Sequence, residues 1–168
     1  MTRPITVDPA GWLSFGTLRF RCALGKGGVT ADKREGDGAT PIGRFALREL
    51  FYRPDKLPDP AGRLPTRAIR PEDGWCDDPS HPDYNLPVRL PHSARCERMW
   101  RDDDCYDLVV PLGYNDDPPV PGLGSAIFLH VARPGYAPTE GCIALAKDDL
   151  LALLAALPAD VEMVIGDC

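Results

Sequence analysis

The sequence lacks several features that would place it in large and familiar classes of protein. It has no run of about 18 apolar residues, so we expect no membrane-spanning helix. Its first 15 residues lack the apolar core of a secretion signal, so no export route is visible as written. Its six cysteines include no Cys-x-x-Cys pair, and no internal repeat or low-complexity linker is present.

The sequence also has fewer basic than acidic residues. The chain has 19 Lys and Arg against 25 Asp and Glu, a net charge of −6, and its basic residues are scattered. A nucleic-acid-binding protein needs a basic face that neutralises phosphates. We therefore expect neither nucleic acid nor an anionic membrane surface as a partner.

What remains is typical of a globular protein rich in turns. The 168 residues suit one domain over 1–168, which we expect to be a monomer, and 43% are hydrophobic. The 19 prolines and 16 glycines favour many loops and few helices. Residues 53–100, rich in Pro, Asp and Arg, predict a long irregular insertion with one short helix around 92–100.

The hydrophobic patterning predicts a mostly β fold. Apolar residues alternate with arginines over 18–24, which is the period of a half-buried strand, and further strand candidates lie near 106–114, 125–131, 142–145 and 161–166. One helix is expected over 148–157, with Asp148 as its N-cap, four leucines at helical spacing and Pro158 at its end. The predicted architecture is a mixed sandwich or open barrel with this single main helix near the C-terminus.

The stretch "HVARPGYAPTEGCIAL", residues 130–145, holds a candidate nucleophile and base. A cysteine nucleophile needs a base, backbone N–H donors for the developing oxyanion, and space for the substrate backbone. Gly141 directly precedes Cys142, and His130 ends an apolar strand 12 residues earlier, a spacing that suits a hairpin of two adjacent strands. The alternative is a buried cysteine and a structural histidine.

Two separated segments resemble the L,D-transpeptidase catalytic domain, the YkuD type. Residues 36–45, "GDGATPIGRF", match that family's Gly-Asp-x-x-Thr-Pro-x-Gly-x-Phe segment, and "TEGCI" matches its Ser/Thr-His-Gly-Cys motif after a histidine. The resemblance covers about 20–155. It implies that Cys142 is the nucleophile and His130 its base, held by the Val131 carbonyl. It also implies that the Gly141 and Cys142 amides form the oxyanion hole, and that no cofactor is needed.

The resemblance further implies peptidoglycan stem peptides as partners, cross-link formation through a thioester, a role in cell-wall organisation and cell shape, and a periplasmic or envelope location. We expect Thr139, Arg133 and Tyr136 to contact the substrate. The family's His before Gly-Cys is Glu140 here, and its Asn or Arg two residues after the cysteine is Ala144. A carboxylate beside the thiol would oppose the thiolate unless it points away or pairs with a cation.

Three other interpretations stay open. The same scaffold could hydrolyse, as an L,D-carboxypeptidase or a wall-linked amide hydrolase, or the chain could be a non-catalytic wall-binding module. A zinc site from Cys76, His81, His92 and Cys96 is conceivable, but the first pair is loosely spaced, so we expect no metal. Residues 74–85 could instead cap the active site.

Overall fold

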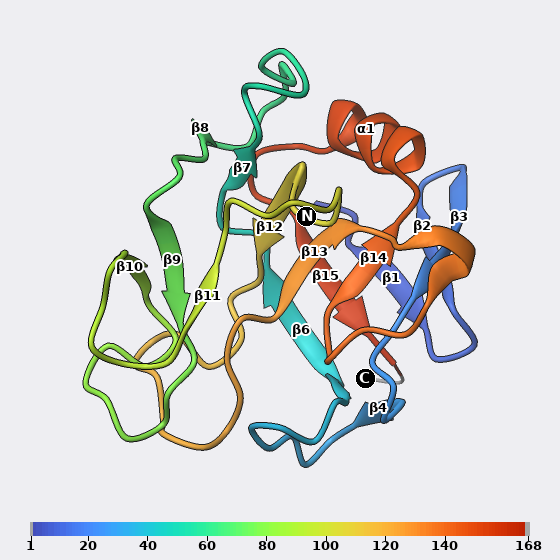
Figure 1. Cartoon of the computed structure of the whole chain (residues 1–168). Helices are drawn as coiled ribbons and strands as arrows, with labels where there is room; N and C mark the ends of the chain where they lie inside the picture. The colour runs from blue at the N-terminus through green and yellow to red at the C-terminus, as the bar shows by residue number, and fades with distance from the viewer. Residues whose placement is uncertain (1, 167–168) are drawn as a thin grey trace.

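The structure, a computed structural model that describes residues 2–166, is built on one curled sheet of ten strands (Figure 1). The strands lie in the order β6-β15-β1-β2-β3-β14-β13-β12-β7-β8. Their bounds are β1 Ile5–Asp8, β2 Trp12–Phe15, β3 Leu18–Ala23, β6 Gly43–Ala46, β7 Leu50–Tyr52, β8 Thr66–Ala68, β12 Leu108–Pro111, β13 Phe128–Val131, β14 Ile143–Leu145 and β15 Glu162–Ile165. The expected mostly β fold with mixed strands is confirmed.

The sheet curls until strands far apart in its order come into contact. A bridge joins Leu47, just after β6, to Leu112, just after β12. The Gly113 amide donates to Ala46 O at 2.8 Å, and the Arg48 amide donates to Pro111 O at 3.0 Å. These bonds satisfy backbone groups that an open edge would expose, and they leave a half-barrel around an apolar core.

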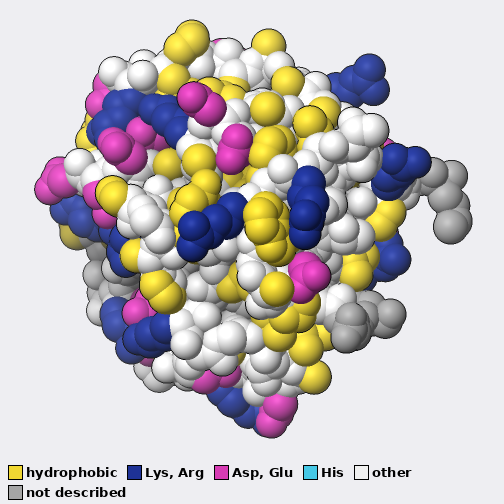
Figure 2. All heavy atoms as spheres, turned by 90° about the vertical axis from the view of Figure 1, so that its right-hand side faces the viewer, with side chains coloured by type: hydrophobic (Ala, Val, Ile, Leu, Met, Phe, Trp, Pro, Cys, Tyr) yellow, Lys and Arg dark blue, Asp and Glu magenta, His cyan; other side chains and the backbone are white. Residues whose placement is uncertain are grey.

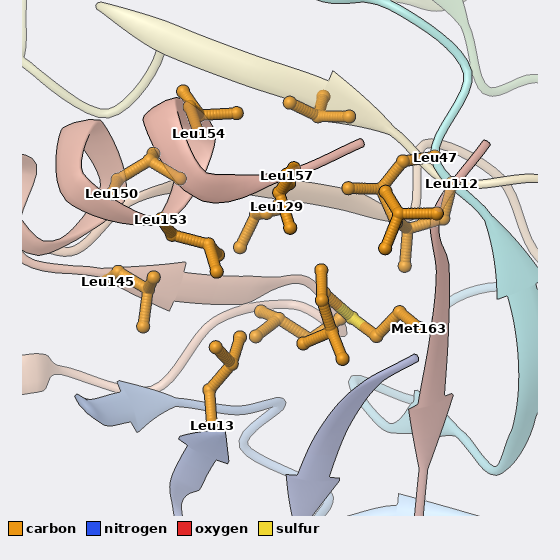
Figure 3. Close-up of a cluster of buried hydrophobic side chains, with 14 of the residues drawn as sticks. Leu13, Leu47, Leu112, Leu129, Leu145, Leu150, Leu153, Leu154, Leu157 and Met163 are labelled. Atoms are coloured by element: carbon orange, nitrogen blue, oxygen red, sulfur yellow. The ribbon is translucent and has the colours of Figure 1, made fainter. Parts of the chain in front are cut away.

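The main helix, α1 (Lys147–Ala156), covers one opening of this half-barrel (Figure 1). Leu153 lies near Leu145 and Leu157 lies beside Leu129, within one buried cluster that also contains Met163 (Figure 3). Leu150, Leu153, Leu154 and Leu157 are at most 4% exposed, as their helical spacing predicted. Asp148 is not the N-cap; that position is Ala146, and Asp148 and Asp149 lie in the first turn, where their charge favours the helix dipole.

The segment 53–100 is more ordered than the sequence suggested. It carries β8 and a three-stranded sheet in the order β10-β9-β11, formed by β9 (Asp73–Cys76), β10 (Pro87–Arg89) and β11 (Cys96–Arg98). The short helix expected around 92–100 is absent, because that stretch pairs with β9 as a strand. The short strands β4 (Val29–Thr30) and β5 (Thr40–Pro41) pair with each other, and β5 lies within the 36–45 segment.

No helix among residues 2–166 is long and apolar enough to cross a membrane. The longest helix in this described range is α1, which has ten residues.

Candidate active site

The candidate nucleophile and base lie on neighbouring strands of the main sheet. β13 and β14 pair in parallel, with His130 opposite Ala144. The strands are therefore adjacent as predicted, but they do not form a hairpin: the connection through η1 (Pro134–Tyr136) returns the chain to the start of β14. Since side chains two residues apart share a face of a sheet, His130 and Phe128 face the same way as Cys142 and Ala144.

The Cys142 sulfur lies at the start of β13, directly against the backbone there. Its Sγ accepts a hydrogen bond from the Phe128 amide at 3.3 Å and donates one to Ala126 O at 3.2 Å. The residue is 8% exposed, and burial, reinforced by the nearby Glu97 carboxylate, raises the pKa of the thiol to about 12. In the free protein at neutral pH the sulfur is therefore a thiol.

The His130 ring is held in one tautomer by the backbone. Its Nδ1 lies 2.9 Å from Val131 O, and because a carbonyl only accepts, Nδ1 carries the proton and Nε2 keeps a lone pair. Burial lowers the pKa of the ring to about 4, and the positive charges of Arg101 and Arg133 act in the same direction. The imidazole is neutral at pH 7 and able to accept a proton.

Tyr106 packs on the His130 ring. The two rings meet edge to face with centroids 5.4 Å apart. The Tyr106 hydroxyl donates to Glu97 Oε1, and the partial burial of this carboxyl raises its pKa. The phenol and the carboxyl thereby connect the small β9–β11 sheet to the ring of the candidate base.

The turn before Cys142 is held by Thr139. Its hydroxyl donates to Cys142 O at 2.7 Å and accepts from the Gly141 amide at 3.1 Å. Gly141 has φ +132°, and a Cβ there would lie 2.7 Å from Ala39 O. Only glycine adopts this backbone readily, so the residue is required by the turn itself. The Gly141 amide is thus engaged within the chain, and its role in an oxyanion hole stays a prediction.

Glu140, which stands where the family has a histidine, points to solvent. Its carboxylate forms an ion pair of 2.9 Å with Lys26, and the two side chains are 77% and 59% exposed. The carboxylate is not among the causes of the raised pKa of Cys142. One condition under which this substitution would leave the thiol undisturbed is therefore met: the carboxylate has a cationic partner.

Both candidate catalytic side chains open onto one pocket of about 350 Å³. Besides Cys142 and His130, its lining includes a set of acidic residues, called here the acidic group, and a set of basic residues, called the basic group. The acidic group is Glu35, Asp77, Glu97 and Glu140, and the basic group is Arg101 and Arg133. Of residues 74–85, Asp77 alone reaches the pocket lining, so that segment contributes a wall and does not cover the site.

The residues expected to contact substrate are divided between two places. Thr139 and Arg133 line the pocket, Thr139 as a buried support of the turn and Arg133 as an exposed side chain. Tyr136 is outside it: its ring lies under Arg21, 4.6 Å away, in a groove beside β2 and β3. The space-filling view of the β2–β3 face shows apolar and basic side chains side by side (Figure 2).

Sequence reasoning missed several residues of the site. Glu97, Arg101 and Glu35 line the pocket, yet they come from stretches interpreted as turn, loop or insertion, and Tyr106 lines it from the start of the strand predicted over 106–114. No local signal distinguished them, since their convergence depends on how the β9–β11 sheet packs against β12 and β13. Trp75 of β9 shows this packing, with its ring 5.1 Å from that of Phe128.

The four residues considered for zinc are separated into two groups. Cys76 and Cys96 oppose each other on β9 and β11. Among the described residues, one set of His, Cys and acidic side chains brings its ligand atoms within 4.8 Å of one another, namely His81, Asp83 and His92. The Nδ1 atom of each histidine accepts a hydrogen bond of 3.0 Å from a backbone amide, that of Asp83 for His81 and that of Ala94 for His92. The Cys2His2 arrangement that was weighed as an alternative is therefore not formed by these described residues.

Comparison with known proteins gives one match. The family model of the L,D-transpeptidase catalytic domain, YkuD, matches residues 11–165, nearly the whole chain. No curated protein and no solved structure matches the sequence.

Proposed function

The chain belongs to the L,D-transpeptidase (YkuD) catalytic-domain family, and on that premise we propose that it cross-links peptidoglycan stem peptides through a thioester on Cys142. The observation that carries this proposal is the shared pocket: a thiol and an imidazole with a free Nε2 lone pair lie on one face of two adjacent strands and line the same 350 Å³ space. The family acts on peptidoglycan, and we place the protein in the cell envelope for that reason.

The electrostatics of the site favour proton transfer during attack over a preformed ion pair. With the pKa of the Cys142 thiol raised to about 12 and that of His130 lowered to about 4, both groups are neutral at pH 7. In the proposed step the sulfur attacks the carbonyl carbon of the donor peptide while His130 Nε2 takes the thiol proton. Negative charge then passes to the carbonyl oxygen, and no buried thiolate has to exist beforehand.

The acyl-enzyme follows from the same two residues. The C–N bond of the donor breaks, the leaving amine takes the proton from His130, and the acyl group stays on Cys142 as a thioester. The neutral amine of a second stem attacks this thioester, His130 accepts its proton, and the thiol is restored as the new amide forms. Water in place of the amine would give hydrolysis by the same path.

The charges around the pocket support a substrate that carries both an amine and a carboxylate. Arg133 is the exposed cation of the basic group and is suited to hold a terminal carboxylate. Arg101 already binds Asp103 through two bonds of 2.8 and 2.6 Å. Glu35 and Asp77, in the acidic group, can attract the amine of the acceptor stem.

The decisive experiment supplies purified tetrapeptide muropeptides to the wild type and to Cys142→Ala and weighs the products. Dimers with release of one D-residue per bond support transfer, and an acyl-enzyme should appear in the intact-protein mass of the wild type only. Monomers that lose a D-residue without dimers would replace transfer by L,D-carboxypeptidase activity. His130→Gln serves as the second variant, because it keeps a donor for Val131 O and removes the base.

A binding module without catalysis makes the opposite prediction. It requires that Cys142→Ala retain every measurable function and that the wild type form no product from muropeptides. Sedimentation with purified peptidoglycan, run on both proteins in parallel, measures binding independently of turnover. Equal binding together with zero turnover in the wild type would reject the proposed enzyme.

A further inference from the structure

Cys76 and Cys96 face each other across the β9–β11 pair in the register that brings side chains closest. They are direct partners in this antiparallel ladder. Backbone bonds between the two strands flank them, from the Asp77 amide to Arg95 O (3.2 Å) and from the Met99 amide to Asp73 O (3.0 Å). Because hydrogen-bonded pairs alternate along such a ladder, the pair 76/96 is a non-hydrogen-bonded one.

The backbone of Cys76 confirms this assignment. Its amide donates to Leu86 O at 3.0 Å and its carbonyl accepts from the Asn85 amide at 2.8 Å, so both groups point to the β10 side. Opposite residues in non-hydrogen-bonded pairs have Cα atoms about 4.5 Å apart. That separation falls inside the range of about 4.4–6.8 Å found across disulfides.

The two cysteines also differ in solvent exposure, and this difference suits a reaction in which one sulfur reacts before the other. Cys76 is fully buried, whereas Cys96 is partly exposed and lines a surface hollow with Glu72, His92 and Arg98. A soluble disulfide can therefore meet Cys96 first, and the buried partner lies behind it. Both residues are free thiols in the structure.

We propose that Cys76 and Cys96 are a disulfide-forming pair that locks the β9–β11 sheet beside the active-site pocket. The Cys96 thiolate attacks a disulfide oxidant, R–S–S–R, releases one R–SH and leaves a mixed disulfide on Cys96. The Cys76 thiolate then attacks the Cys96 sulfur, a second R–SH leaves, and the intramolecular S–S bond remains. The two protein thiols together lose two electrons, and the oxidant gains these electrons and becomes two R–SH molecules.

The cross-link would restrain a wall of the site, since each cysteine adjoins a pocket residue. Asp77 follows Cys76 and Glu97 follows Cys96, and both line the pocket with Cys142. The bond also closes the loop 77–95, which contains β10 and the turns on either side of it. Closing a loop restricts the unfolded chain and resists strand separation.

Protonation sets the rate of the reaction. Burial and the neighbouring Cys76, together with Asp77 and Asp78, raise the pKa of the Cys96 thiol to about 11. Because the thiolate is the nucleophile, the rate with a fixed concentration of glutathione disulfide should rise about tenfold per pH unit between 7 and 9.

The test treats the whole protein with glutathione disulfide, denatures it in an alkylating agent, and maps the tryptic peptides without reduction. The expected result is a fall from six to four free thiols and one cross-linked peptide pair that contains Cys76 and Cys96. After limited trypsin cleavage at Arg89, the two fragments should stay joined on a non-reducing gel and separate when reduced. Recovery of both cysteines in alkylated form, or a cross-link between any other pair, would overturn the proposal.

Two single variants, one test and one matched control, are oxidised in the same way. Cys96→Ser should keep all five of its thiols after oxidation, while Cys22→Ser, which changes a buried cysteine of β3, should still lose two. Loss of two thiols in Cys96→Ser would contradict the assignment. The wild-type peptide map decides the question alone if either variant does not fold.

Discussion

Acidification should destabilise this protein through one histidine of the candidate active site. In the folded protein, burial lowers the pKa of His130 from 6.5 to about 4. The unfolded chain therefore binds a proton at a pH where the folded chain does not. Stability from the neutral ring is fully present above pH 6.5, and it is lost progressively between 6.5 and 4.

The size of the effect follows from the two pKa values. Each pH unit of difference corresponds to about 1.4 kcal/mol, so the change in unfolding free energy across this window is about 3 kcal/mol. Glu97 acts in the opposite direction, because its pKa is raised and the folded state gains stability as its carboxyl protonates. The contribution of His130 must therefore be measured as a difference between proteins.

His130→Gln isolates that difference, because glutamine does not titrate and its amide can donate to Val131 O. Urea unfolding of both proteins, followed by tryptophan fluorescence at several pH values between 7.5 and 4, gives the two stability profiles. The wild type should lose about 3 kcal/mol more than the variant over this range. Parallel profiles would show that the ring is not held neutral by burial, and the general-base argument would lose its electrostatic support.

Three further predictions concern the turn around the thiol. Thr139→Val removes two buried hydrogen bonds, to Cys142 O and from the Gly141 amide, and should cost about 1–3 kcal/mol of unfolding free energy, whereas Thr139→Ser keeps both bonds and should cost less. Equal stability of these two variants would contradict the role given to the hydroxyl. Gly141→Ala places a Cβ 2.7 Å from Ala39 O at φ +132°, and it should cost about 1–3 kcal/mol of unfolding free energy and reduce turnover. The control Gly135→Ala, with φ +69° and nothing within 4 Å of the added Cβ, should cost less unfolding free energy. A larger loss for Gly135→Ala than for Gly141→Ala would refute the steric argument. Lys26→Ala breaks an exposed ion pair with Glu140 and should change stability by less than about 1 kcal/mol in a denaturant titration, so a larger loss would show that this pair supports the turn.

Local patterns in the sequence predicted the elements whose burial follows from a short-range period. The alternation over 18–24 gave β3, and the leucines of 148–157 gave the buried face of α1. The 36–45 and 139–143 segments carried the family resemblance, and the family match confirms it. In each case the information lies within a few neighbouring residues, where backbone geometry alone fixes which side chains share a face.

Errors arose where local signals competed with long-range pairing. The residues around Cys96 have the composition of a short helix or loop, yet they form a strand that pairs with β9. The 12-residue spacing of His130 and Cys142 allows either a hairpin or a parallel pair, and the structure has the parallel one. Spacing limits how far apart two strands can lie but does not set their direction.

The sequence by itself determined the mostly β fold and the family and supplied a candidate catalytic pair, because each depends on residue type and near-neighbour order. The tertiary structure alone decided the surroundings of that pair: a thiol and an imidazole both kept neutral by burial, a Glu140 turned to Lys26, and a pocket wall with Glu97 and Tyr106 from a separate small sheet. Burial and charge at a site are sums over residues distant in the chain, and they exist only once the sheet has curled and the insertion has packed against it.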